Sequence, residues 1–169
     1  MKGNQTVSEK QIVVFNMGEE SYGVDIAMVR EIIQLQPVTR VPGTPPSVEG
    51  MINLRGSVIP IVDLRKRFKL ESIPHSKNTR IVVVSCKGQD VGVVVDAVAE
   101  VLRVATESIE PPSNLFTGEN LEHMQGIVKL TNRLVILLNM DQVLSRNELT
   151  SLNAVNNQNN PSEKQAVTL

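Results

Sequence analysis

Two parts of the chain repeat one pattern of glycines, apolar residues and acids, and this repeat constrains the fold more than any other feature. When Gly23 is aligned with Gly92, the apolar residues that follow fall opposite each other at identical spacing, and Glu31 meets Glu100. In both copies an apolar stretch and a glycine-containing turn come first. The alternative is chance similarity between valine-rich strands, which would not be expected to keep every spacing.

The later part of the repeat follows a second pair of glycines. When Gly50 is aligned with Gly126, the apolar residues that follow coincide, and Asp63 meets Asn139. Both of these polar residues are suited to capping a short helix. Repetition at this separation predicts two similar subdomains in one chain and excludes a short-period solenoid.

The composition favours strands over helices. Hydrophobic residues make up 41% of the 169 residues but aromatic residues only 2%, so the core must be aliphatic, and valine and isoleucine prefer pleated surfaces. The turn signals delimit expected strands at 11–17, 21–24, 31–36, 48–54, 58–62, 79–86, 90–95, 125–130 and 134–139. Residues 97–104 are ambiguous between a helical turn and a strand, and a terminal helix is expected over 140–149. About five short strands in each copy cannot hide both edges of a flat sheet, so each copy is predicted to close into a small barrel.

Several classes of function find no support. The net charge is −1, with 17 basic and 18 acidic residues, which gives no electrostatic footprint for nucleic acid. Two histidines and one cysteine cannot form a zinc set, and neither a nucleophile elbow nor a phosphate-binding loop is present. We therefore expect no enzymatic activity, no metal and no cofactor. No signal segment and no apolar run of about 20 residues is seen, which predicts a cytoplasmic protein without direct membrane insertion.

Two charged features are candidates for binding. A short basic cluster formed by Arg65, Lys66, Arg67 and Lys69 surrounds Phe68, and a solvated helix face is favoured there over a phosphate site.

The second feature is the hairpin turn at Arg55-Gly56, where Gly56 and Ser57 suit a tight turn. The second copy has Thr131-Asn132 instead of Arg55-Gly56. Arg55 and Glu31 are expected at neighbouring ends of the first copy, rimmed by Val29, Ile33 and Ile52. This composition suits a binding hot spot, and the alternative is a surface salt bridge worth at most about 1 kcal/mol.

Three motifs carry a resemblance to a known family. They are Gly-Met-Ile-Asn-Leu-Arg-Gly at 50–56 with the proline-rich 41–46 before it, Ile-Pro-Ile-Val-Asp-Leu-Arg at 59–65, and Tyr-Gly-Val-Asp-Ile at 22–26. With Val-Gly-Val-Val-Val-Asp at 91–96, they resemble the CheW-like family of bacterial chemotaxis coupling proteins over about residues 11–148. The resemblance implies an all-β fold with a few short helices, made of two intertwined five-stranded SH3-like β-barrel subdomains.

The resemblance also implies a domain organisation. It implies a single CheW-like domain at 11–150. The polar composition on either side predicts a flexible N-terminus at 1–10 and a disordered polar tail at 151–169. Within the domain the subdomains are expected at about 20–80 and 81–150, with the N-terminal strand open to exchange between them.

The function implied by the resemblance is that of an adaptor. It would link the histidine kinase CheA, through the kinase's regulatory domain, to the cytoplasmic tips of methyl-accepting chemotaxis receptors. By matching position, Val29, Glu31, Gly50, Arg55 and Gly56 would contact the receptor, whereas the kinase-contact residues are not identified. The alternatives are a coupling protein for a chemotaxis-like kinase pathway with another output, or a ligand-binding small β-barrel.

Overall fold

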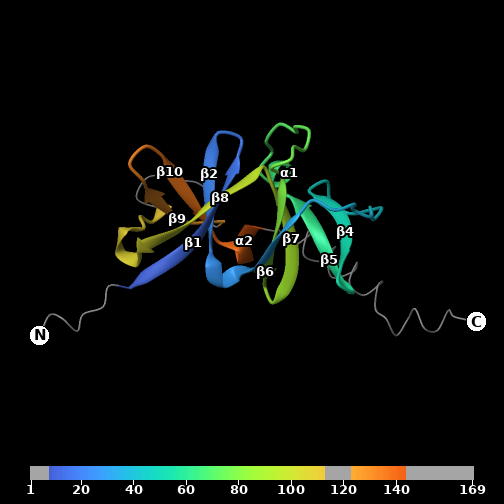
Figure 1. Ribbon diagram of the computed structural model, residues 1–169, viewed down its shortest axis with the longest axis horizontal. Coiled ribbons are helices and arrows are strands. Elements are labelled where there is room, and N and C mark those ends of the chain that lie inside the picture. The colour runs from blue at the N-terminus through green and yellow to red at the C-terminus, as the bar shows by residue number, and fades with distance from the viewer. Residues whose placement is uncertain (1–7, 113–122, 144–169) are drawn as a thin grey trace, which may run out of the picture.

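A computed structural model describes residues 8–112 and 123–143 of the chain. Its strands form two five-stranded sheets that lie side by side along the long axis of the molecule (Figure 1). The first sheet has the order β3 (Val29–Gln34), β6 (Arg80–Cys86), β7 (Gln89–Val95), β5 (Ser57–Asp63) and β4 (Val48–Leu54). The second sheet has the order β8 (Ala97–Ala105), β1 (Glu9–Met17), β2 (Glu20–Asp25), β10 (Leu134–Leu138) and β9 (Met124–Lys129). Short helical turns are η2 (Ile26–Met28), α1 (Leu64–Arg67), η3 (Thr106–Ser108) and α2 (Met140–Val143). The predicted all-β class with a few short helices is confirmed.

The two copies of the repeat exchange strands. Strands β1 and β2 of the first copy lie in the second sheet with β8, β9 and β10, and β6 and β7 of the second copy lie in the first sheet. The expected division into 20–80 and 81–150 therefore does not follow the sheets, because a whole hairpin is exchanged in each direction. The exchange depends on two parallel pairings, β5 with β7 and β2 with β10, which the order of the strands along the chain does not predict.

The pairings confirm the repeat. Gly92 lies opposite Ile61 on β5, and Gly23 lies opposite Leu137 at the equivalent place on β10. A Cβ atom added to Gly23 would lie 2.4 Å from Cγ2 of Ile12, and one added to Gly92 would lie 2.6 Å from Cδ1 of Ile61. Both glycines therefore leave room for an isoleucine side chain from a neighbouring strand.

The core explains why the two sheets form one domain. A central cluster takes residues from both sheets and from both short α-helices, among them Phe15, Val62, Leu64, Val82 and Leu138. A smaller cluster of four isoleucines, one leucine and two valines belongs to the first sheet. Another small aliphatic cluster belongs to the second sheet. Because burial of apolar surface is the main driving force of folding, the shared cluster holds the two sheets together in one domain.

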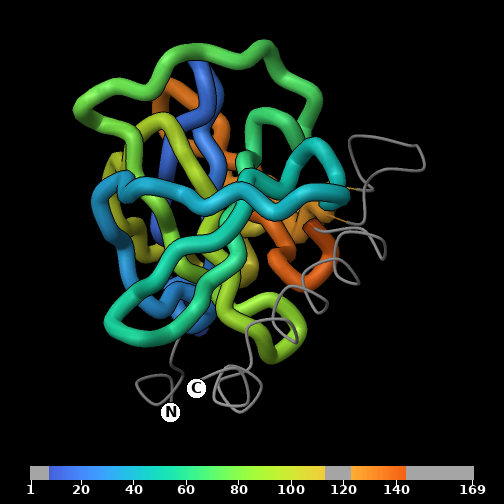
Figure 2. The backbone as a smooth tube through the Cα atoms, turned by 90° about the vertical axis from the view of Figure 1, so that its right-hand side faces the viewer, coloured from blue at the N-terminus to red at the C-terminus, as the bar shows by residue number. Residues whose placement is uncertain are grey.

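At one edge of each sheet, a segment outside the named strands pairs with the edge strand. We call the segment around Thr39, which follows β3, the strap. Thr39 pairs with Met51 on β4 through two backbone hydrogen bonds of 2.8 Å, and Glu110 pairs with Ile127 on β9. In Figure 2 the strap that follows β3, light blue to cyan, runs across the front of the molecule. The opposite edges are formed by β3 and β8, which pair with another named strand on one side only.

Local predictions from the sequence are mostly confirmed. The carboxylate of Asp25 accepts a hydrogen bond from the amide of Ala27, and that of Asp63 accepts one from Arg65, so both are helix caps. The ambiguous segment 97–104 is strand throughout, because it pairs along its length with β1. Strand β1 begins at Glu9, inside the range expected to be flexible. Predictions for residues 1–7, for the helix beyond Val143 and for the tail at 151–169 lie outside the described residues.

Candidate functional site

An ion pair joins Arg55 in the β4–β5 turn to Glu31 on the edge strand β3. The turn places Arg55 because its two central residues are Arg55 and Gly56, with φ of 51° and 89°, rather than the expected Gly56-Ser57. Two successive positive φ values are typical of the type I′ turn, which matches the twist of the flanking strands. The side chain of Asn53 stabilises the turn by accepting a hydrogen bond of 2.8 Å from the amide of Gly56.

This ion pair is exposed, which limits its contribution to stability. The Arg55 side chain is 69% exposed and that of Glu31 is 32% exposed. Pairs in water at such sites contribute about 0–1 kcal/mol to folding. The fold therefore depends little on this ion pair.

The apolar residues expected around the pair are placed differently. Ile52 is buried in the core of the first sheet, and Ile33 packs against that core while Val29 packs against the central cluster. The apolar side chain that β3 leaves open to solvent is Ile32, which is 41% exposed. Ile32 was not among the predicted binding residues, because the sequence does not show that β3 is an edge strand.

Gly50 has a structural role that the sequence did not reveal. It is buried beneath the strap, with φ of 146°, and a Cβ atom there would lie 2.0 Å from the carbonyl oxygen of Thr39. Because Met51 beside it pairs with Thr39, the missing side chain is what lets the strap close over β4. Any influence of Gly50 on a bound partner therefore acts through the position of the strap.

The second sheet carries a related ion pair that the sequence analysis also missed. Arg133 binds Glu100 on β8, which is the repeat equivalent of Glu31 on β3. Val101, the equivalent of Ile32, is 52% exposed. The arginine stands two residues after Thr131, so aligning the turns position by position hid it, and the two copies differ less than their turn sequences indicate.

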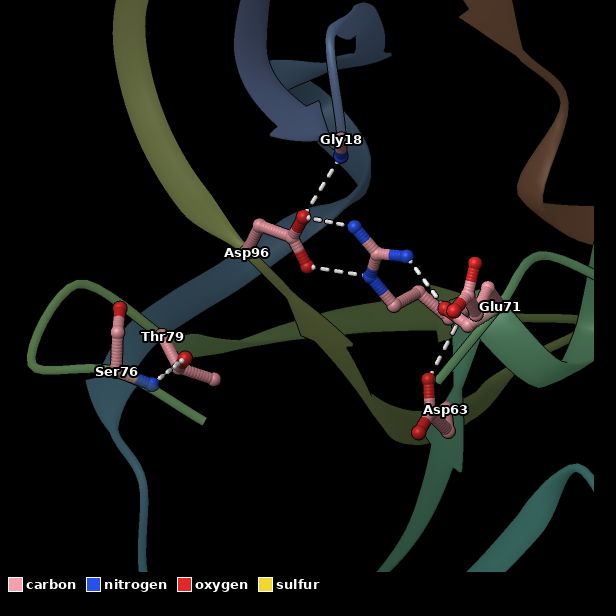
Figure 3. Close-up of polar contacts among 7 residues, drawn as sticks. Gly18, Asp63, Glu71, Ser76, Thr79 and Asp96 are labelled. Atoms are coloured by element: carbon pink, nitrogen blue, oxygen red, sulfur yellow. Dashed lines mark hydrogen bonds and ion pairs between the residues drawn. The ribbon is translucent and has the colours of Figure 1, made fainter. Parts of the chain in front are cut away.

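Two of the four residues of the basic cluster at 65–69, Arg65 and Lys66, are paired with carboxylates. Arg65 donates two hydrogen bonds to Asp96, of 2.9 and 2.6 Å, and Lys66 pairs with Glu49 at 2.6 Å (Figure 3 draws the first contact). The hydrogen bonds from Arg65 lower the pKa of the Asp96 carboxyl, and the same bonds raise the pKa of the Arg65 guanidinium. These pairings count against a phosphate site, but the Arg65 side chain is only 12% exposed, so this residue does not belong to the solvated helix face that was predicted.

Nowhere in 8–112 and 123–143 do three or more histidine, cysteine or acidic side chains gather in a way that could hold a metal ion. Among the described residues, no helix combines the length and the apolar character that a membrane span requires. A cavity of about 380 Å³ lies beside an aromatic series in which Phe15, Tyr22, Phe68 and His123 contact one another in turn. Burial raises the pKa of the Tyr22 hydroxyl.

Comparison with known proteins gives consistent results. The family described as "CheW-like domain" matches residues 11–148. The chain is 34% identical to Chemotaxis protein CheW of Klebsiella aerogenes over 162 residues, which cover 92% of this chain and 98% of that protein. It is 36% identical to Chemotaxis protein CheW of Helicobacter pylori, over 80% of this chain and 82% of the relative. The crystal structure of the scaffolding protein TtCheW from Thermoanaerobacter tengcongensis is similar with a TM-score of 0.76 and 40% identity, over 83% of this chain and 96% of that one.

Proposed function

The chain belongs to the CheW-like domain family, and we propose that it is a non-catalytic adaptor that couples methyl-accepting chemotaxis receptors to the histidine kinase CheA. The observation that carries the proposal is the exposed Glu31–Arg55 pair on the open edge of the first sheet, in a chain whose relatives are named chemotaxis and scaffolding proteins. A coupling protein of this kind acts through docking faces. The exposed Glu31–Arg55 pair is suited to one such face, because it offers charged groups to a partner.

The first docking face is proposed for the receptor. Its tip is a helical hairpin, and an amphipathic helix binds by laying its apolar side against apolar side chains of the partner. Ile32 on the free edge supplies an apolar contact, and the Arg55 guanidinium supplies a planar donor set held in place by Glu31. Val29 anchors β3 by packing against the central core cluster. Gly56 adopts the positive φ that the turn requires, and Gly50 leaves room for the strap at Thr39.

The second partner is proposed to be the regulatory domain of CheA. The resemblance implies that this domain has the same double-barrel fold, so the two would pack end against end. Several such adaptors in one array would raise the effective concentration of each contact, and weak individual contacts would suffice. Recruitment to membrane receptor arrays would then take place through the partners.

Arg55→Ala tests the receptor face, and Arg133→Ala is its matched control on the second sheet. Both remove an arginine from an exposed pair with a glutamate, so both should leave the fold intact. Binding to a purified receptor-tip fragment, measured by calorimetry, should weaken about 10-fold for Arg55→Ala, a loss of about 1.4 kcal/mol. Arg133→Ala should remain within about twofold of the wild-type affinity.

Separate titration with the CheA regulatory domain distinguishes the two faces. Arg55→Ala should bind the kinase domain as the wild type does, because Arg55 is assigned to the receptor. Unchanged affinity of Arg55→Ala for the receptor fragment would contradict the assigned receptor face. The proposed function itself would be contradicted if the wild-type chain bound neither the receptor fragment nor the CheA regulatory domain.

A further inference from the structure

The described chain crosses between the two sheets twice: η2 joins β2 to β3, and the single residue Asp96 joins β7 to β8. The backbone amide of Asp96 donates a hydrogen bond of 3.1 Å to the carbonyl oxygen of Asn16 on β1. Because β7 belongs to the first sheet and β8 to the second, a rotation of one sheet against the other requires a change in the backbone dihedral angles at Asp96, accompanied by one at the longer link, η2.

The side chain of Asp96 is held from both sheets (Figure 3). One carboxylate oxygen accepts a hydrogen bond of 2.9 Å from Nε of Arg65, and the other accepts bonds from Nη2 of Arg65 at 2.6 Å and from the amide of Gly18 at 2.7 Å. Arg65 lies on α1 directly after β5 of the first sheet, and Gly18 lies in the β1–β2 turn of the second. We call these three residues the first lock.

The first lock is better shielded from water than the other arginine–carboxylate pairs of the described chain. The side chains of Arg65 and Asp96 are 12% and 22% exposed, and the remaining Arg65 nitrogen donates a bond of 2.6 Å to the carbonyl oxygen of Glu71. A bidentate, charge-assisted contact fixes the direction of both side chains as well as their distance. The geometry therefore opposes rotation at Asp96.

The repeat places a second, simpler contact at the equivalent junction. The alignment that pairs Gly23 with Gly92 also pairs Gly18 with Lys87, and the one that pairs Asp63 with Asn139 also pairs Arg65 with Asp141. In the structure the amide of Lys87, in the β6–β7 turn, donates a bond of 2.7 Å directly to the carboxylate of Asp141 on α2. Lys87 and Asp141 form the second lock. In each lock, a hairpin turn of one sheet is therefore bonded to the side chain of a short helix, and that helix comes directly after a strand of the other sheet.

We propose that the first lock sets the orientation of the two sheets relative to one another and that the second lock contributes less to it. The first lock gathers four hydrogen bonds on a partly buried ion pair at one of the two chain crossings, whereas the second is one bond between an amide and a carboxylate. If the proposed function holds, this orientation also determines how a partner on the first sheet is placed relative to one on the second. The orientation itself can be tested without either partner.

Residual dipolar couplings of the backbone amides measure the orientation in solution. In the wild-type chain one alignment tensor should fit the amides of both sheets. In Asp96→Asn, which keeps the shape but removes the charge, and in Arg65→Lys, which keeps the charge but removes the fork, the two sheets should require different tensors. Asp141→Asn should produce a smaller difference than either.

The matched control is Asp90→Asn, which breaks the exposed Arg30–Asp90 pair on the same strand, β7. It should leave one tensor sufficient for both sheets. One shared tensor in both Asp96→Asn and Arg65→Lys would overturn the proposal, and so would an equal change in Asp90→Asn or Asp141→Asn. If Asp96→Asn loses its dispersed amide spectrum, Arg65→Lys decides the result alone.

Discussion

Replacing Gly50 by alanine should destabilise the protein far more than the same replacement at a glycine with free space around its Cα atom. The new Cβ atom would lie 2.0 Å from the carbonyl oxygen and 2.7 Å from the carbonyl carbon of Thr39, and these backbone atoms cannot rotate away as a side chain can. The strap must therefore lift from β4. The φ of 146° at Gly50 adds strain for any residue with a side chain.

The cost can be worked out from the contacts that are lost. Lifting the strap breaks both hydrogen bonds between Thr39 and Met51, each 2.8 Å long, at about 1 kcal/mol apiece. The unfavourable φ contributes about 1–2 kcal/mol. The free energy of unfolding should thus fall by about 3–4 kcal/mol, a large share of the typical 5–15 kcal/mol for a domain.

Urea unfolding of Gly50→Ala beside Gly88→Ala measures this effect. Gly88 has φ of 80° and no atom within 4 Å of an added Cβ, so its alanine carries only the strain of about 1–2 kcal/mol. The difference between the two variants isolates the collision with the strap. Equal destabilisation of the two variants at an unchanged m-value would refute the structural role of Gly50.

Two further predictions concern Asp96 and Cys86. The pKa of Asp96 is lower in the folded chain than its ordinary value of 3.8, so the first lock stabilises the fold above that pH and is lost as the pH falls through the lowered pKa. Asp96→Asn should therefore cost about 2–3 kcal/mol at neutral pH and progressively less in urea titrations below about pH 4, and a constant difference would contradict this. Cys86 is 1% exposed, and its thiol donates a hydrogen bond to the carbonyl oxygen of Met140, with 3.0 Å between the sulfur and the oxygen. A thiol reagent should modify it only as fast as the chain opens, and immediate labelling of the folded protein would be the opposing result.

Much of the local structure could be predicted from the sequence because its causes are local. Asp25 and Asp63 were identified as caps since a short carboxylate before an apolar run accepts orphan amide protons, wherever the helix lies. The hairpin at residues 48–62 was identified from its two apolar runs, although the turn is centred on Arg55-Gly56.

The candidate site was predicted only in part. The pairing of Glu31 with Arg55 was anticipated from neighbouring ends of the first copy, and the structure brings these two side chains together. Exposed Ile32 and the Glu100–Arg133 pair were missed, because burial depends on which strands lie at the sheet edges.

The sequence by itself determined an all-β chain with two copies of one strand pattern and an aliphatic core, because side-chain periodicity and turn residues act within a few positions of the chain. The tertiary structure decided that each copy gives its first hairpin to the other, that Gly50 lies under a strap and that Asp96 is locked by Arg65. Alternation of apolar residues shows which face of a strand is buried, but it does not specify which strand lies beside it. That choice depends on packing between segments far apart in the chain, and here the shared central core packs strands of both sheets together.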